Sequence, residues 1–154
     1  MNPKNHDRRH IFKIIGTVIL AIAFPALPSF SQPMSTLVLE VSGFKNTRGT
    51  LNCRLFSQAS DFPDGEGILT VRVPIAGSNT SCTFSNIEPG NYSVAAVHDE
   101  NSNGKLDKNF VGVPSEGYGV SNNKTYALSS PKWDESIFTI AASESKTLQV
   151  KLRY

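Results

Sequence analysis

The segment from Asp99 to Asp107 carries the residues whose types and spacing could do chemistry. Side-chain oxygens recur at Asp99, Asn101 and Asn103, a glycine takes the sixth place, and an acid takes the ninth at Asp107. This spacing matches the first nine places of a calcium loop of the EF-hand type, in which alternating oxygens surround the ion and the glycine permits a sharp turn. We expect the carbonyl of Lys105 to supply one further ligand.

The calcium pattern lacks its last ligand, because the twelfth place, where a bidentate Glu belongs, is occupied by Phe110. Glu116 is the nearest downstream carboxylate that could fold back to complete the shell. Lys105 and Lys108 lie close enough in sequence to oppose a cation. We therefore expect Ca²⁺ as the candidate cofactor, bound weakly, with a dissociation constant of about 10⁻⁴ to 10⁻³ M as in extracellular modules.

A plain turn is the alternative interpretation of this segment. Asn103-Gly104 is a strong hairpin dipeptide, and the side chains of Asp99 and Asn101 can each hydrogen-bond to nearby backbone. The helices that flank an EF-hand loop are also missing from the pattern. Calcium loop and plain turn both stay open at this point.

His98 is the residue on which an enzyme would depend, because the other two histidines fall in the leader described below. A zinc site with several histidines is excluded within one such chain, and a hydrolytic triad would have to use His98. Asp99 lies beside it in a strand and points to the opposite face. Ser115 and Ser121 lack the strand-turn-helix signature of a hydrolase nucleophile. We expect a non-catalytic module, with a hydrolase that uses His98 as the alternative.

Three aromatic residues are candidate contacts for a ligand, namely Tyr118, Tyr126 and Trp133. Exposed aromatic rings anchor many binding surfaces, so these residues point to recognition of an extracellular protein or glycan. The alternative is that the rings cover a small hydrophobic core.

The elements that must position these residues are β-strands, because apolar residues alternate with polar ones along most of the chain. Seven short strands are predicted, at residues 37–42, 50–56, 69–75, 81–84, 92–98, 137–142 and 148–154. Segment 94–97 is apolar on both faces, which is typical of a central strand. The pattern predicts an all-β fold, a two-sheet antiparallel sandwich of the immunoglobulin type, with a barrel as the alternative.

A long connection interrupts this regular pattern between Glu100 and Glu135. No strand is predicted within it, and connections of such length are usually functional or disordered. Its many apolar residues are sufficient to pack against a domain, so we expect an ordered loop excursion.

Cys53 and Cys82 are the two cysteines of the chain. Each alternates with apolar residues on the inward face of a predicted strand, so both thiols should point into the core. In an oxidising compartment a disulfide between them is expected, with two buried free thiols as the alternative.

Residues 1–31 have the organisation of an N-terminal signal helix. A basic start precedes an apolar run over residues 14–26, and small residues surround Ser31. Cleavage after Ser31 would leave 32–154 as one β-sandwich domain. An uncleaved membrane anchor is the alternative, but the run is shorter than the roughly 20 residues that a spanning helix needs, and two prolines interrupt it. Arg8-Arg9 also resembles a twin-arginine signal, so either export route fits.

Removing the leader changes the charge balance. The full chain has 15 Lys and Arg and 13 Asp and Glu, and the remainder keeps 11 basic and 12 acidic residues, a net charge of −1. A near-neutral chain without a basic run gives no electrostatic reason to bind nucleic acid or an anionic membrane. We therefore expect a secreted or periplasmic protein that binds neither nucleic acid nor, after removal of the leader, a membrane.

Three stretches of the sequence resemble one bacterial family. They are Phe84-x-x-Ile87-x-Pro89-Gly90-x-Tyr92-x-Val94, then His98-Asp99-Glu100-Asn101-x-Asn103-Gly104-Lys105-Leu106-Asp107, and Gly112-Val113-Pro114-x-Glu116-Gly117-Tyr118-Gly119-Val120-Ser121-Asn122. Together they are similar to the domain family of unknown function DUF2141. The resemblance implies a secreted or periplasmic domain, and it implies no reaction. The Pro-Gly-x-Tyr piece alone is similar to transthyretin-like and carboxypeptidase regulatory-like sandwiches.

Overall fold

Eight strands and two short helical segments make up the part of the chain that the computed structural model describes, residues 33–124 and 129–154. In chain order they are β1 (Ser35–Ser42), β2 (Thr50–Phe56), β3 (Leu69–Pro74), β4 (Asn79–Ile87), β5 (Gly90–Asp99), β6 (Gly117–Val120), η1 (Ser121–Asn123), α1 (Trp133–Ser136), β7 (Phe138–Ile140) and β8 (Ser145–Lys151). The all-β prediction is confirmed. The predicted signal helix lies outside the described residues. None of the described helices has the length and apolar character needed to cross a membrane.

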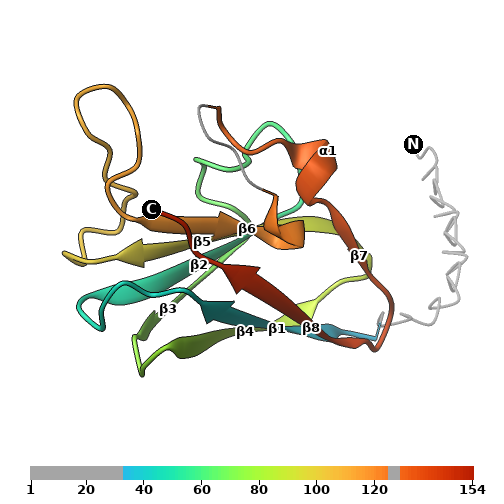
Figure 1. Ribbon diagram of the computed structural model, residues 1–154. Helices are drawn as coiled ribbons and strands as arrows, with labels where there is room; N and C mark the ends of the chain where they lie inside the picture. Colours follow the sequence, from blue (N-terminus) through green and yellow to red (C-terminus); the bar gives the residue numbers. More distant parts are fainter. Residues whose placement is uncertain (1–32, 125–128) are drawn as a thin grey trace, which may run out of the picture. The chain divides into compact units, whose positions relative to one another are not determined.

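Two sheets form the sandwich that the alternating pattern predicts (Figure 1). One has the order β4-β1-β8 and the other β3-β2-β5-β6, with β7 pairing to β5. The pairing of β1 with β8 is parallel, with Leu39 opposite Leu148, so the antiparallel prediction is wrong for this pair. Alternation of polar and apolar residues indicates which face of a strand is buried, and it does not indicate the direction of the strand.

The main core lies between the two sheets. Leu37, Leu39 and Val41 of β1 meet Leu51 and Leu55 of β2, and all five side chains are fully buried. Burying an aliphatic side chain of this size contributes about 1.5–3 kcal/mol. The inward-facing side chains that sequence alternation predicts therefore supply the hydrophobic stability of the fold.

A second, smaller core lies on the outer face of the five-stranded sheet. Phe56, Ala95 and Val120 are buried there, and Phe62 and Trp133 pack against them. The central strand β5 is therefore apolar on both faces because it faces a core on each side, as predicted. This cluster covers one end of the outer face and leaves the other end to the loops.

The described parts of segment 100–135, residues 100–124 and 129–135, are ordered, and the prediction that the segment contains no strand is wrong. Strand β6 lies within it and pairs with β5. Glycines hide this strand in the sequence, and Gly119 has a steric reason, because a Cβ there would lie 2.7 Å from Cγ1 of Val150 and 2.9 Å from the carbonyl oxygen of Lys151. Glycine within a strand often marks such a close approach of two backbones.

The predicted disulfide between Cys53 and Cys82 is present, with the two Cα atoms 6.5 Å apart. Cys53 belongs to β2 and Cys82 to β4, so the bond joins the two sheets through the core. Both residues are fully buried, as their inward phase predicts.

Candidate functional site

Asp99 anchors the loop that follows β5. Its carboxylate is fully buried and accepts hydrogen bonds from Nδ2 of Asn52 (2.8 Å), the backbone N of Gly104 (2.7 Å) and the backbone N of Asn103 (3.0 Å). Gly104 has a φ of +82°, a conformation that glycine adopts without strain. The sharp turn expected at the sixth place is therefore present, and Asn52 of β2 ties it to the sheet.

Asn101, Asn103 and Asp107 meet in the middle of this loop. The side-chain nitrogens of the two asparagines donate to the Asp107 carboxylate at 2.7 and 3.0 Å. Their side-chain oxygens each accept one backbone hydrogen bond, from Asn103 and from Lys105, which leaves each oxygen a second lone pair. The predicted ligands Asp99, Asn101, Asn103 and Asp107 thus lie in one loop, and the side chain of each takes part in hydrogen bonds within it.

Three or more Asp, Glu, His or Cys side chains do not converge into a metal-binding group anywhere in residues 33–124 and 129–154. A cation in the 99–107 loop would therefore depend on amide and carbonyl oxygens, including the carbonyl of Lys105, beside the two aspartates. Such neutral oxygens are normal ligands for Ca²⁺ and reduce the affinity of a site.

Glu116 holds the two ends of the loop together. It is buried, and its two oxygens accept the backbone N–H groups of Glu100 (2.8 Å) and Asp107 (3.0 Å). The side chain of Glu100 turns away to Asn46 and Arg48, and the hydrogen bond from Asn46, followed by that from Arg48, holds the pKa of Glu100 below its usual value. The structure therefore gives Glu116 a clamping position, in which its oxygens face backbone groups.

His98 is fully buried on the inner face of β5, and both of its ring nitrogens have partners. Nε2 lies 2.8 Å from the carbonyl oxygen of Arg48, which can only accept, so Nε2 carries the hydrogen. Nδ1 lies 2.6 Å from the hydroxyl of Tyr154, which also accepts the backbone N–H of Lys45. Burial raises the pKa of Tyr154, so this hydroxyl is protonated at neutral pH and donates to Nδ1. Both ring nitrogens of His98 are therefore engaged in hydrogen bonds.

The two serines considered for a triad lie apart from His98. The hydroxyl of Ser121 donates to the carbonyl of Ser136 and accepts the backbone N–H of Val94 at 3.1 Å. Ser115 is exposed, and its backbone N–H bonds the carbonyl of Asp107. The described residues therefore place no serine against His98, whose two ring nitrogens face Tyr154 and Arg48.

The first part of the excursion, residues 100–116 between β5 and β6, carries an ordered apolar tip. This tip projects beyond the strands (Figure 1). Phe110 is 100% exposed, Val111 64% and Val113 40%. The turn beneath them is fixed, because Oδ1 of Asn109 accepts the backbone N–H groups of Val111 and Val113, and the backbone N of Asn109 bonds the carbonyl of Val113 at 2.8 Å. The exposure of these side chains is thus built into a defined turn.

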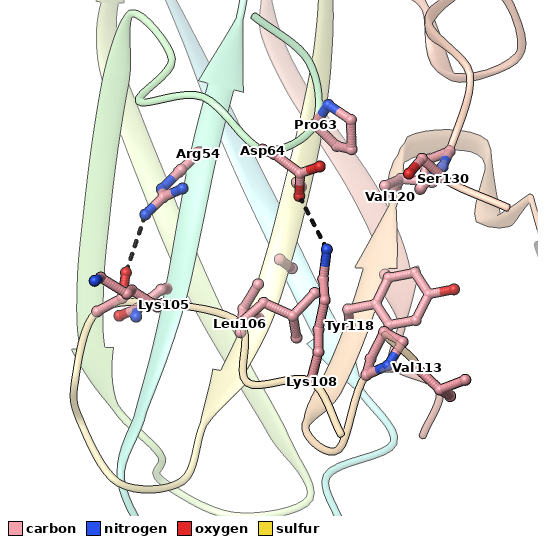
Figure 2. Close-up of a pocket in the computed structure, with 18 of the residues that line it drawn as sticks. Arg54, Pro63, Asp64, Lys105, Leu106, Lys108, Val113, Tyr118, Val120 and Ser130 are labelled. Atoms are coloured by element: carbon pink, nitrogen blue, oxygen red, sulfur yellow. Dashed lines mark hydrogen bonds and ion pairs between the residues drawn. The ribbon is translucent and has the colours of Figure 1, made fainter. Parts of the chain in front are cut away.

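A pocket of about 930 Å³ lies on the outer face of the five-stranded sheet, between the excursion and the loop that joins β2 to β3. Arg54 crosses its floor and donates to the carbonyls of Gly65 (3.0 Å) and Gly104 (3.0 Å), one on each loop. Lys108 reaches across the pocket to Asp64 at 3.9 Å (Figure 2). The pocket therefore has two walls that are tied together at its floor and its rim.

The predicted aromatic contacts have different positions. Tyr118 lies on β6, is half-buried and lines the pocket. Trp133 packs edge-on against Phe62 in the second core and does not line the pocket. Tyr126 lies outside the described residues. The basic pocket residue Arg54 was not predicted from the sequence. Its one sequence signal is that it lies on the polar face of its strand, whereas Leu55 lies on the apolar face.

The fold and the site define the class of this protein as a disulfide-linked β-sandwich with a long loop excursion. The chain belongs to the DUF2141 family, whose model, described as an uncharacterized protein conserved in bacteria, matches residues 39–149. The match contains the calcium-like loop, the apolar tip and β6. A search of the curated proteins found no match, and a search of the solved structures found none.

Proposed function

We propose that this protein is a non-catalytic binding module that recognises an extracellular protein partner through the tip of its excursion. The observation that carries the proposal is the full exposure of Phe110 on a turn whose backbone is fixed. Single exposed apolar residues are ordinary, but three neighbours on a projecting turn form an apolar patch, which is typical of interaction sites. Aromatic anchors of this kind provide much of the affinity of protein interfaces.

The chemistry of the tip favours a protein over a glycan. A sugar that stacks on an aromatic side chain also needs neighbouring polar side chains that form hydrogen bonds with its hydroxyl groups. Phe110 has Val111 and Val113 as neighbours, and the side-chain oxygen of Asn109 is already used by the backbone. An apolar groove on a protein is the better complement.

Calcium has a supporting role in this proposal. Weak binding through Asp99, Asn101, Asn103, Asp107 and the Lys105 carbonyl would hold the base of the excursion and so reduce the conformational entropy that the tip loses on binding. Supporting observations are the convergence of these side chains in one loop and the positive φ of Gly104.

The proposed location is the periplasm or the cell exterior. The leader-like segment 1–31 supports export, and the cross-sheet disulfide suits an oxidising compartment. A protein exported in this way should begin at Gln32, which N-terminal sequencing of the secreted material measures.

The binding role is tested by immobilising the exported protein and offering it extracellular proteins of the bacterium that encodes it, and separately a glycan panel, in CaCl₂ and in EDTA. We expect a protein to be retained in CaCl₂, and Phe110→Ser to reduce its retention by at least about tenfold, as for an interface hot spot. Ile68→Ser is the matched control, because Ile68 is an exposed apolar residue on another loop. Equal retention by Phe110→Ser, or retention of glycans alone, contradicts the proposal.

A further inference from the structure

Two guanidinium groups converge on one end of the pocket beside Gly104. Nη2 of Arg54 lies 3.0 Å from the carbonyl oxygen of Gly104. Arg72 comes from the neighbouring strand β3, and a Cβ on Gly104 would lie 3.1 Å from its Nη2. Lys105 also lines the pocket and lies on the same side as Arg54 (Figure 2). Three basic groups from three segments therefore face one part of the pocket.

No carboxylate neutralises these groups within the described part of the chain. The bonds of Arg54 go to two carbonyls, and among residues 33–124 and 129–154 no hydrogen bond or ion pair engages the side chains of Arg72 and Lys105. Asp99, behind the Gly104 turn, accepts hydrogen bonds from amide groups only. Among the described residues that line the pocket, four are basic and two are acidic, which gives a net charge of +2. They are Arg54, Arg72, Lys105, Lys108, Asp64 and Glu66.

The rest of the described lining is largely apolar. Ala95, Val97 and Val120 of the sheet contribute to it, with Val113 from the excursion and the ring of Tyr118. Figure 2 places Arg54 and Lys105 on one side of the pocket and Tyr118, Val113 and Val120 on the other. The site thus joins a cationic end to an apolar and aromatic end.

We propose that this pocket binds a small amphiphilic anion, with a carboxylate, sulfonate or phosphate group at Arg54, Arg72 and Lys105 and an apolar body against Val97 and Tyr118. Guanidinium groups bind such anions in a planar, often bidentate geometry. A volume of about 930 Å³ lies within the usual range of small-molecule sites. The pocket shares Val111 and Val113 with the proposed protein-binding tip, but Phe110 does not line it, and neither proposal requires the other.

The test uses a pair of dyes that differ in charge. Anilinonaphthalene sulfonate is an aromatic anion that fluoresces in apolar surroundings, and phenylnaphthylamine is its neutral counterpart without the sulfonate. We expect saturable binding of the anionic dye at one site per chain, with the neutral dye at least about tenfold weaker, as loss of a charge-assisted hydrogen bond implies. Arg72→Gln should weaken the anionic dye about tenfold and leave the neutral dye unchanged, whereas Arg72→Lys should retain part of the affinity.

Lys146→Gln is the control, because Lys146 lies on β8 in the other sheet and its loss removes the same charge. Arg54 is left intact because it ties the two loops together. The melting temperature of each variant is measured first, so that dye binding is compared among folded proteins only. Equal affinity for both dyes, or no effect of Arg72→Gln, overturns the anion site while leaving an apolar pocket. If neither dye binds, the pocket takes no such ligand and the proposal falls, and the partner-capture experiment on Phe110 is unaffected.

Discussion

The hydroxyl of Tyr154 gives Nδ1 of buried His98 its only described hydrogen bond. Replacing Tyr154 with Phe should therefore leave a buried ring nitrogen without a partner and lower the free energy of unfolding by about 1–3 kcal/mol. Urea denaturation measures this difference. The backbone N–H of Lys45 also loses its acceptor, but it is exposed and water can replace the hydroxyl.

Tyr92→Phe is the matched control. The hydroxyl of Tyr92 donates to the carbonyl of Glu88 at 2.8 Å, and Glu88 is exposed, so its carbonyl can turn to water. We expect a cost of about 1 kcal/mol or less. Equal costs for the two substitutions would contradict the view that Tyr154 satisfies a buried histidine.

His98 also marks the limit of prediction for single residues. Alternation along the strand places His98 and Asp99 on opposite faces, and the structure confirms this, with His98 inside and Asp99 under the loop. The local pattern contains no information on Tyr154, which reaches His98 from the far end of the domain. The same limit applies to Arg72, whose neighbour Gly104 belongs to a distant loop.

Among the elements, the disulfide links two strands that belong to different sheets. Its sequence separation of 29 residues corresponds to a stabilisation of about 3–4 kcal/mol in the chain-entropy description. Reducing agent should therefore lower the urea midpoint of unfolding by a corresponding amount. The Cys53→Ala/Cys82→Ala variant should already be less stable and should not respond to reductant. A response of the double variant would show that the reductant acts elsewhere.

Strands with clear alternation were predictable from the sequence, and those built around close contacts were not. β2 matches its predicted range of 50–56, because polar and apolar residues alternate there on both sides of Cys53. β6 was missed because Gly117, which lies against Tyr154, and Gly119, which lies against β8, look like turn residues in sequence. The apolar residues between 100 and 135 predicted an ordered segment, as its described parts are, and one interpretation of the aromatic rings was that they cover a core. No local signal indicated that the core covered by Trp133 would be a second one.

The response of the whole molecule to calcium tests the loop at 99–107. If Ca²⁺ binds the folded protein with the expected dissociation constant, about 10 mM CaCl₂ should stabilise it by about 1–3 kcal/mol relative to EDTA. For a domain of this size the melting temperature should rise by about 5–10 °C. Scanning calorimetry measures the shift, and about 10 mM MgCl₂ should give less because Mg²⁺ demands a stricter geometry.

Asp107→Asn should abolish the calcium shift, because Asp107 supplies one of two carboxylates in the loop and is not fully buried. Asp134→Asn is the control, since Asp134 is an exposed acid in α1. An unchanged melting temperature of the unmodified protein in CaCl₂ would leave the Asn103-Gly104 turn as the better explanation of the pattern.

The parallel pairing of β1 with β8 joins two segments that lie far apart in the chain. β1 is the central strand of its sheet, yet one of its two partners comes from the far end of the domain, as the pairing of Leu39 with Leu148 records. Contacts between such distant segments carry a large loop-closure entropy and are associated with slow folding. A chain synthesised from its N-terminus leaves one edge of β1 unpaired until β8 arrives, and unpaired edges favour aggregation. A holding chaperone that shields β1 in that interval would therefore raise the yield of folded protein.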